Sequence, residues 1–179
     1  TTNAALRAWV AETAKLTQPE HIHWCTGSDT ERDDLTELML TRGDLIALDQ
    51  ASFPNCYLHR SHPSDVARVE HLTFICTKNK DDAGPNNNWM DPADAHRKVD
   101  ALFAGCMKGR TMYVMPYCMG PILSPYARCG VEITDSPYVV LNMRIMTRMG
   151  APALHRIEQD GTFVKGLHSV GDLDPDKRF

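Results

Sequence analysis

The chain has 179 residues, of which 42 % are hydrophobic and 23 % are charged, and its formal net charge is −4. These values are typical of a globular protein with one hydrophobic core. The small acidic excess argues against general nucleic-acid binding, and no apolar run approaches the roughly 20 residues that cross a membrane. The six cysteines include no Cys-x-x-Cys pair, so we expect free thiols in a cytoplasmic protein.

Hydrophobic periodicity predicts helices and strands along the whole chain. Asn3 is a suitable cap for the first helix, which Pro19 ends, and Asp91-Pro92 marks the start of a later one. The predicted helices are 3–16, 29–42, 91–103 and 137–149, and the predicted strands are 21–25, 45–48, 72–76, 111–115, 131–134 and 162–170. This mixture predicts an α/β (mixed α+β) fold with a central mixed sheet flanked by helices.

The segment from Gly109 to Gly150 is expected to form the centre of that sheet. Residues 111–115 are apolar or β-favouring on both faces, which is typical of a buried strand, and we expect Pro116 and Gly120-Pro121 to end it. Asp135 or Ser136 can cap the following helix, Pro137 suits its first position, and Gly150, before Pro152, is expected to end it in a left-handed conformation. The expected buried face of that helix consists of Val139, Met143, Met146 and Met149. The helix over 91–103 has an expected buried face of Ala95, Val99, Leu102 and Phe103.

Three potential zinc ligands lie close together near the amino terminus. His21, His23 and Cys25 share one face of the predicted strand, because side chains repeat every two residues. A small zinc-binding domain is therefore one alternative. Three ligands on one short strand, with no partner pair at ligand spacing elsewhere, favour an ordinary half-exposed edge strand instead.

Arg68 and Glu70 lie in a loop that precedes the predicted strand 72–76. Val66 and Val69 are expected to point inward, which leaves Arg68 and Glu70 facing elsewhere. From composition alone, an arginine beside a glutamate is usually a solvated surface pair.

Longer strings of residues point to one family. They are Gly-Arg-Thr-Met-Tyr-Val from Gly109, Thr-Asp-Ser-Pro-Tyr-Val-Val from Thr134, and Met-Arg-Ile-Met-Thr-Arg-Met-Gly from Met143. Together they resemble the amino-terminal domain of GTP-dependent phosphoenolpyruvate carboxykinase, and the resemblance extends over almost the whole chain. The string Asp-Val-Ala-Arg-Val-Glu, residues 65–70, is also similar to the mobile substrate loop of that family.

The resemblance implies a parent enzyme of gluconeogenesis that converts oxaloacetate and GTP into phosphoenolpyruvate, GDP and CO2. It also implies that Arg68 binds the carboxylate or phosphate of the substrate, for which a forked guanidinium is well suited. Glu70 is implied to couple this loop to closure of a lid. His62 stands where many members have Asp, which changes the charge of the loop near neutral pH.

The sequence contains no Gly-x-x-x-x-Gly-Lys-Ser/Thr string and no clear His/Asp/Lys cluster for the family's catalytic manganese. In the family these elements lie downstream of the matched segment. We therefore expect residues 1–179 to form a single domain, the amino-terminal, substrate-side part of a longer carboxykinase, with 171–179 as a frayed tail.

On this interpretation, GTP and Mn2+ or Mg2+ belong to the carboxy-terminal nucleotide-binding part of the same enzyme. The present segment is expected to bind neither and to be inactive alone, with no catalytic, metal or nucleotide residue of its own. The alternative is a non-catalytic structural or oligomerising module with the same fold.

Overall fold

The computed structural model describes residues 1–61 and 69–171. The α-helices are α1 Ala4–Thr17, α2 Asp29–Arg42, α3 Pro92–Phe103, α4 Pro137–Met146 and α5 Ala151–Asp160, and the 3-10 helices are η1 Glu70–Leu72 and η2 Lys80–Ala83. The strands are β1 His21–Trp24, β2 Ile46–Ala47, β3 Tyr57–Leu58, β4 Phe74–Ile75, β5 Asn88–Trp89, β6 Thr111–Met119, β7 Arg128–Thr134, β8 Arg148–Met149 and β9 Val164–Leu167.

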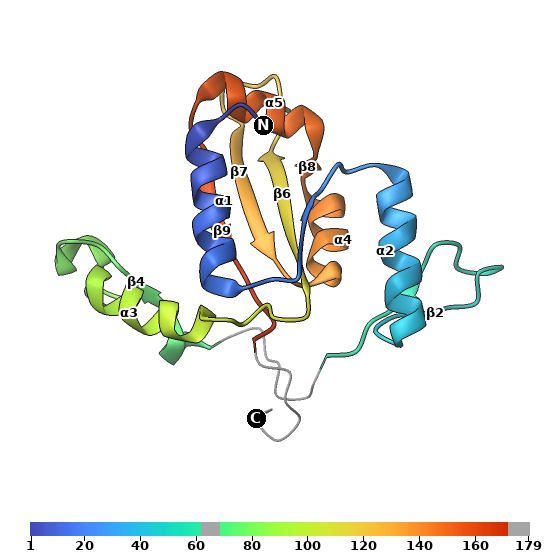
Figure 1. Ribbon diagram of the computed structural model, residues 1–179, viewed down its shortest axis with the longest axis horizontal. Coiled ribbons are helices and arrows are strands. Elements are labelled where there is room, and N and C mark those ends of the chain that lie inside the picture. The colour runs from blue at the N-terminus through green and yellow to red at the C-terminus, as the bar shows by residue number, and fades with distance from the viewer. Residues whose placement is uncertain (62–68, 172–179) are drawn as a thin grey trace.

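One mixed sheet forms the centre of the fold (Figure 1). Its strand order is β1-β6-β7-β9, and β8 pairs with β6 beyond the end of β1. β1 is parallel to β6 and β9 is parallel to β7, whereas β6 and β7 are antiparallel. The α/β fold class with a mixed central sheet is confirmed.

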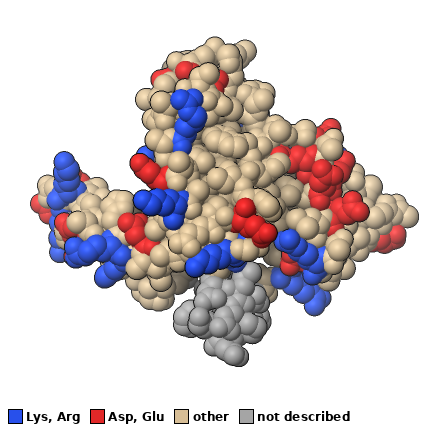
Figure 2. All heavy atoms as spheres, in the orientation of Figure 1, with Lys and Arg blue, Asp and Glu red and all other residues tan. Residues whose placement is uncertain are grey.

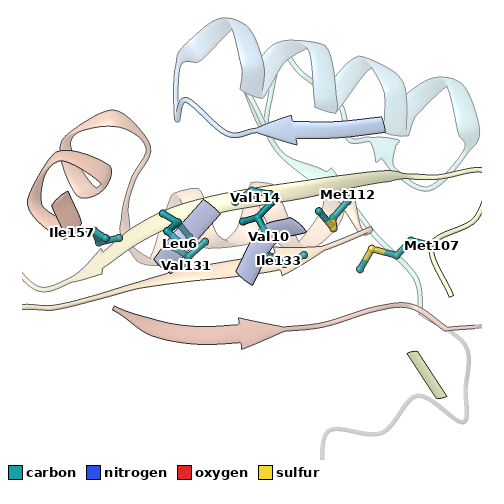
Figure 3. Close-up of a cluster of buried hydrophobic side chains, with 8 residues drawn as sticks. All are labelled: Leu6, Val10, Met107, Met112, Val114, Val131, Ile133 and Ile157. Carbon is teal, nitrogen blue, oxygen red and sulfur yellow. The ribbon is translucent and has the colours of Figure 1, made fainter. Parts of the chain in front are cut away.

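Helices cover both faces of this sheet. α1 and α5 pack on one face, where the buried side chains in Figure 3 are Leu6, Val10, Met107, Met112, Val114, Val131, Ile133 and Ile157. On the other face, α2 and α4 enclose Cys25, Leu35, Tyr113, Met115 and Val140. Alternate residues of β6 therefore enter two different cores, which confirms that residues 111–115 form a strand buried on both faces.

The predicted end of the strand at Pro116 is wrong, because β6 continues through Pro116 to Met119 and ends directly before Gly120-Pro121. The carbonyl of Pro116 accepts a hydrogen bond of 2.8 Å from the amide of Gly150. Since N and C=O of one strand residue face the same side, the nitrogen of Pro116 lies where β1 has already ended and β8 has not begun. No ladder hydrogen bond is lost there, so proline is tolerated inside the strand.

Gly150 has the expected positive φ, 91°, but it does not end a long helix. α4 ends at Met146, β8 follows, and Gly150 precedes α5, a helix that the sequence pattern did not predict. Pro152 lies in the first turn of α5, where a missing amide hydrogen does no harm. Met146, expected on a buried face, is 61 % exposed because the helix stops there.

Two small units project from the central sheet (Figure 1). One is the β2–β3 pair, and the other contains β4, β5 and α3. The predicted buried face of α3 is wrong for the described part of the chain, in which Val99 is 44 % and Leu102 is 80 % exposed. The predicted strand 72–76 is reduced to β4, because residues 70–72 form a 3-10 turn.

Within the described residues, no helix combines the length and apolar character that a membrane crossing requires. Residues 172–179, the greater part of the predicted frayed tail, lie outside the described residues.

Candidate functional site

A cavity of about 580 Å3 with a mixed polar and apolar lining lies at the end of the central sheet where β6 begins and β7 ends. The carboxy-terminal end of α2, the amino-terminal end of α4 and the segment after β3 form its other walls. Its polar lining residues are Arg42, Asp44, His59, Ser61, Arg110, Asp135, Ser136, Tyr138 and His168.

An ion pair between Arg110 and Asp135 organises the inner wall of this cavity. The guanidinium Nη2 lies 3.0 Å from the carboxylate Oδ2, and the Asp135 side chain is fully buried. The other hydrogen bonds of Asp135 come from the hydroxyl of Ser169, at 2.8 Å, and the amide of Val170, at 3.0 Å. Arg110 Nη2 also donates to the carbonyl of Gly171. This pair therefore joins the start of β6, the end of β7 and the segment after β9.

The start of α4 forms a second wall through side-chain hydrogen bonds. Ser136 caps the helix by accepting from the amide of Val139, and its own amide donates to the hydroxyl of Thr134. The same hydroxyl lies 2.8 Å from Nδ1 of His168. The imidazole of His168 is thereby held at the rim of the cavity by the last residue of β7.

The outer wall comes from the segment that follows β3. The His59 ring stacks on Tyr138, with 4.0 Å between ring centroids, and its Nδ1 is 2.7 Å from the carbonyl oxygen of Asp44. Ser61, the last described residue before the gap at 62–68, also lines the cavity. The loop predicted to bind substrate therefore leaves the described structure at this rim.

Arg68 and His62, two of the residues singled out from the sequence, lie outside the described residues, as does Val66. Glu70 begins η1, and its side chain is exposed. Its backbone carbonyl accepts a hydrogen bond of 2.6 Å from the side-chain amide of Asn88. Val69, which was expected to point inward, is 40 % exposed, because the 3-10 turn after it packs little side-chain surface.

The structure separates the three potential zinc ligands of the first strand. His21 is 72 % exposed in its side chain, whereas His23 and Cys25 lie beside Glu31, which comes from the first turn of α2. Burial, together with the nearby Glu31 carboxylate, raises the pKa of the Cys25 thiol well above its usual value.

Among the described residues, this is the one grouping of three or more His, Cys, Asp or Glu side chains with mutually close ligand atoms. Its thiol does not suit Mn2+ or Mg2+, which prefer oxygen ligands. The grouping therefore does not fit the divalent cation that the family resemblance implies.

Sequence patterns missed most of the cavity. His59, His168 and Ser136 come from separate elements, and only the capping signal at Ser136 was visible. Two ion pairs lie in this region: Arg110 pairs with Asp135, and Arg144 pairs with Asp29.

The fold and the cavity define a class of α/β domain with a cavity at one end of a mixed central sheet. Comparison with known proteins then gives the family. The family model for the phosphoenolpyruvate carboxykinase N-terminal domain matches residues 8–178. The chain belongs to this family.

Several curated relatives carry the name phosphoenolpyruvate carboxykinase [GTP]. The protein from Anaeromyxobacter dehalogenans (strain 2CP-C) is 57 % identical over 179 residues, which are 100 % of this chain and 30 % of the relative. The Corynebacterium jeikeium protein is 54 % identical over 98 % of this chain and 29 % of its own length. The Chlamydia pneumoniae protein is 54 % identical over 93 % of this chain and 28 % of its own length. The chain thus spans less than a third of the relatives it matches.

Proposed function

We propose that this chain is the amino-terminal, substrate-side part of a GTP-dependent phosphoenolpyruvate carboxykinase. The observation that carries the proposal is the 57 % identity to a protein of that name, spread over all 179 residues. The reaction would convert oxaloacetate and GTP into phosphoenolpyruvate, GDP and CO2, as a cytoplasmic step of gluconeogenesis. GTP and Mn2+ or Mg2+ are assigned to the part of the protein outside these residues.

In this proposal, Arg68 binds and orients the substrate. Its guanidinium offers parallel N–H donors that match a carboxylate or a phosphate. The resulting role is positioning of the substrate in the closed site, without proton transfer. The position of Ser61 on the cavity rim supports this role, since the loop that contains Arg68 begins directly after it. Glu70, at the far end of the loop, is proposed to couple the loop to lid closure.

The test is Arg68→Ala in the full-length protein. A bidentate pair of charge-assisted hydrogen bonds contributes about 3 kcal/mol. Its loss corresponds to a decrease of roughly 100-fold in kcat/KM for oxaloacetate. Arg68→Lys should recover only part of the loss, because an ammonium group cannot form the forked pair.

Arg60→Ala is the matched control, because this exposed arginine precedes the same loop. It should leave kcat/KM close to the wild-type value. Glu70→Gln, measured in the same assay, should lower kcat more than it changes substrate binding. Near-normal kinetics of Arg68→Ala would refute the assignment of substrate binding to this loop.

A non-catalytic, oligomerising module remains the second candidate function. The observation that favours it is the exposed apolar surface of α3, where Leu102 is 80 % exposed. Absence of carboxykinase activity in the full-length protein, together with a stable oligomer of this chain in analytical ultracentrifugation, would select this candidate.

A further inference from the structure

The turn between β1 and α2 brings together three side chains of different ligand chemistry. His23 and Cys25 lie two residues apart at one face of the sheet, and Glu31 reaches them from the first turn of α2. One ligand atom from each, an imidazole nitrogen, the thiol sulfur and a carboxylate oxygen, all lie within 4.8 Å of one another. This spacing is close to what a single metal ion needs, given metal–ligand distances of about 2.0–2.3 Å.

The carboxylate of this cluster is already fixed in place. Glu31 Oε1 accepts a hydrogen bond of 2.9 Å from the amide of Thr26, and Oε2 accepts one of 2.8 Å from the amide of Gly27. Ser28 caps α2 and thereby holds the first turn that carries Glu31. These bonds use backbone donors, so the carboxylate keeps lone pairs for a further partner.

The imidazole and the thiol are held as firmly. His23 Nε2 lies 2.7 Å from Glu31 Oε1, and the His23 ring meets the Tyr113 ring edge-on at 5.8 Å between centroids. Cys25 is 4 % exposed, and its amide donates to the carbonyl of Val114. The strand ladder and the helix cap therefore arrange the three groups in advance, which lowers the entropy cost of binding an ion.

The charges around the cluster favour a cation. Glu31 is 8 % exposed, so its carboxylate interacts strongly with any nearby charge. Asp34 on the same helix lines the adjoining cavity, and Figure 2 shows Asp and Glu side chains gathered over α2, of which Asp29 and Asp33 are paired with Arg32. A divalent cation would offset this negative charge and would bind the Cys25 sulfur as thiolate, with the thiol proton released to solvent.

From this geometry we infer that His23, Cys25 and Glu31 form a binding site for a zinc-class divalent cation. A ligand set of one nitrogen, one sulfur and one oxygen suits Zn2+. Three protein ligands leave a fourth position, and a cavity of about 450 Å3 lined by His23, Glu31 and Tyr113 adjoins the cluster and gives access to a water molecule. This inference is independent of the proposed function.

The competing explanation is structural. In that case the His23–Glu31 pair only fastens the β1–α2 turn, and the buried thiol only fills space in the core. The two explanations differ in a measurable way, because only the first gives stoichiometric metal binding with a metal–thiolate bond.

Titration of the full chain with Co2+, a spectroscopic probe for Zn2+, tests the inference. We expect one equivalent to bind, with a thiolate-to-cobalt charge-transfer band in the near ultraviolet that Zn2+ abolishes. Cys25→Ser should remove that band, and His23→Gln should weaken binding at least tenfold. His23 is partly exposed, so the second variant is the one expected to fold normally.

Two matched controls exclude binding elsewhere. His21→Gln alters an exposed histidine of the same strand, and Cys76→Ser alters an exposed free thiol. Both should bind Co2+ as the wild type does, and Zn2+ should raise the melting temperature of both but not of His23→Gln. Absence of stoichiometric binding by the wild type, or a band that depends on Cys76, would overturn the inference.

Discussion

Gly27 and Gly150 lie where two turns pass each other. A Cβ atom at Gly150 would overlap the backbone carbonyl of Thr26, and one at Gly27 would lie 2.7 Å from the carbonyl oxygen of Met149. Both residues have positive φ, 73° at Gly27 and 91° at Gly150. The contact fixes the β1–α2 turn against β8, so glycine is required at both positions by sterics as well as by backbone conformation.

Gly150→Ala should therefore destabilise the fold by about 3 kcal/mol or more, because the backbone of Thr26 has to move. Gly161→Ala is the matched control: φ there is 71°, yet nothing lies within 4 Å of the added Cβ. Gly161→Ala should lower the free energy of unfolding by only about 1 kcal/mol, because it adds backbone strain alone. Urea unfolding followed by circular dichroism measures both, and equal losses would contradict the steric explanation.

Glu132 is an acidic residue that β7 places in a partly buried position. It pairs with Met115 on one side and Gly166 on the other, and a side chain at Gly166 would overlap its carboxylate. Burial raises the pKa of Glu132 above its ordinary value of 4.5. The folded state therefore binds this proton more tightly than the unfolded state does.

The sign of the pH effect follows from that difference. Between pH 4.5 and the raised pKa, the folded state holds more protons, so this group's contribution to stability falls as pH rises through the window. Above the raised pKa, the full destabilisation caused by burying the ionised Glu132 carboxylate is present. Glu132→Gln should consequently be more stable than the wild type at neutral pH, and the gain should shrink as pH approaches 4.5.

Thermal unfolding across this pH range tests the effect, with Glu37→Gln on the exposed face of α2 as the control. A gain for Glu132→Gln that does not change with pH would show that desolvation of the carboxylate is not its cause.

At the scale of elements, α5 shows how a short amphipathic helix closes the core. Ile157 from α5 is fully buried against the sheet, while Ile145 near the end of α4 is 82 % exposed. Ile157→Ala should cost about 3 kcal/mol, because it removes buried methyl groups and leaves a cavity. Ile145→Ala, the same substitution on a surface, should change stability by less than about 0.5 kcal/mol. Similar values for the two variants in chemical unfolding would contradict the assigned core.

Local sequence signals predict most helix starts correctly, but they do not predict α5 or the full length of β6. The caps at Asn3, Ser136 and Asp91 correctly mark helix starts, since capping depends on residues within one turn. The sequence pattern does not predict α5, because Gly150 and Pro152 indicate the end of the preceding helix, although the same pair can also precede a new helix. Pro116 was misjudged because tolerance of proline depends on which neighbouring strand is present, and that is a long-range property.

The candidate site was predictable to a smaller extent. Resemblance to the family drew attention to Arg68 and Glu70, whereas the cavity beside their loop combines residues from both ends of the chain, such as Arg42 and His168. The zinc alternative named two of the three clustered residues. Glu31 was missed because strand periodicity carries no information about a neighbouring helix.

At the scale of the whole molecule, the central sheet and the projecting units differ in how well they are buried. The central strands β6 and β7 are largely buried, but α3, β2, β3 and β4 expose large apolar side chains, among them Ile46, Leu58, Ile75 and Leu102. The amphipathic pattern of α3 is real, but within residues 1–61 and 69–171 its apolar side is only partly covered, and none of its residues is fully buried. Periodicity thus predicts which side of a helix favours burial, but it does not predict which part of the protein buries that side.

The projecting units also occupy one continuous stretch of the chain, between two neighbouring strands of the central sheet. His21 lies beside Thr111, so strands roughly 90 residues apart in sequence are neighbours in the sheet, and both projecting units fall in the intervening segment. The entropy of closing such a loop grows only with the logarithm of its length, by about 0.6 kcal/mol for each doubling. Insertions and deletions between α2 and α3 are therefore thermodynamically inexpensive, and evolution can remodel this stretch, including the loop of Arg68, while the sheet stays the same.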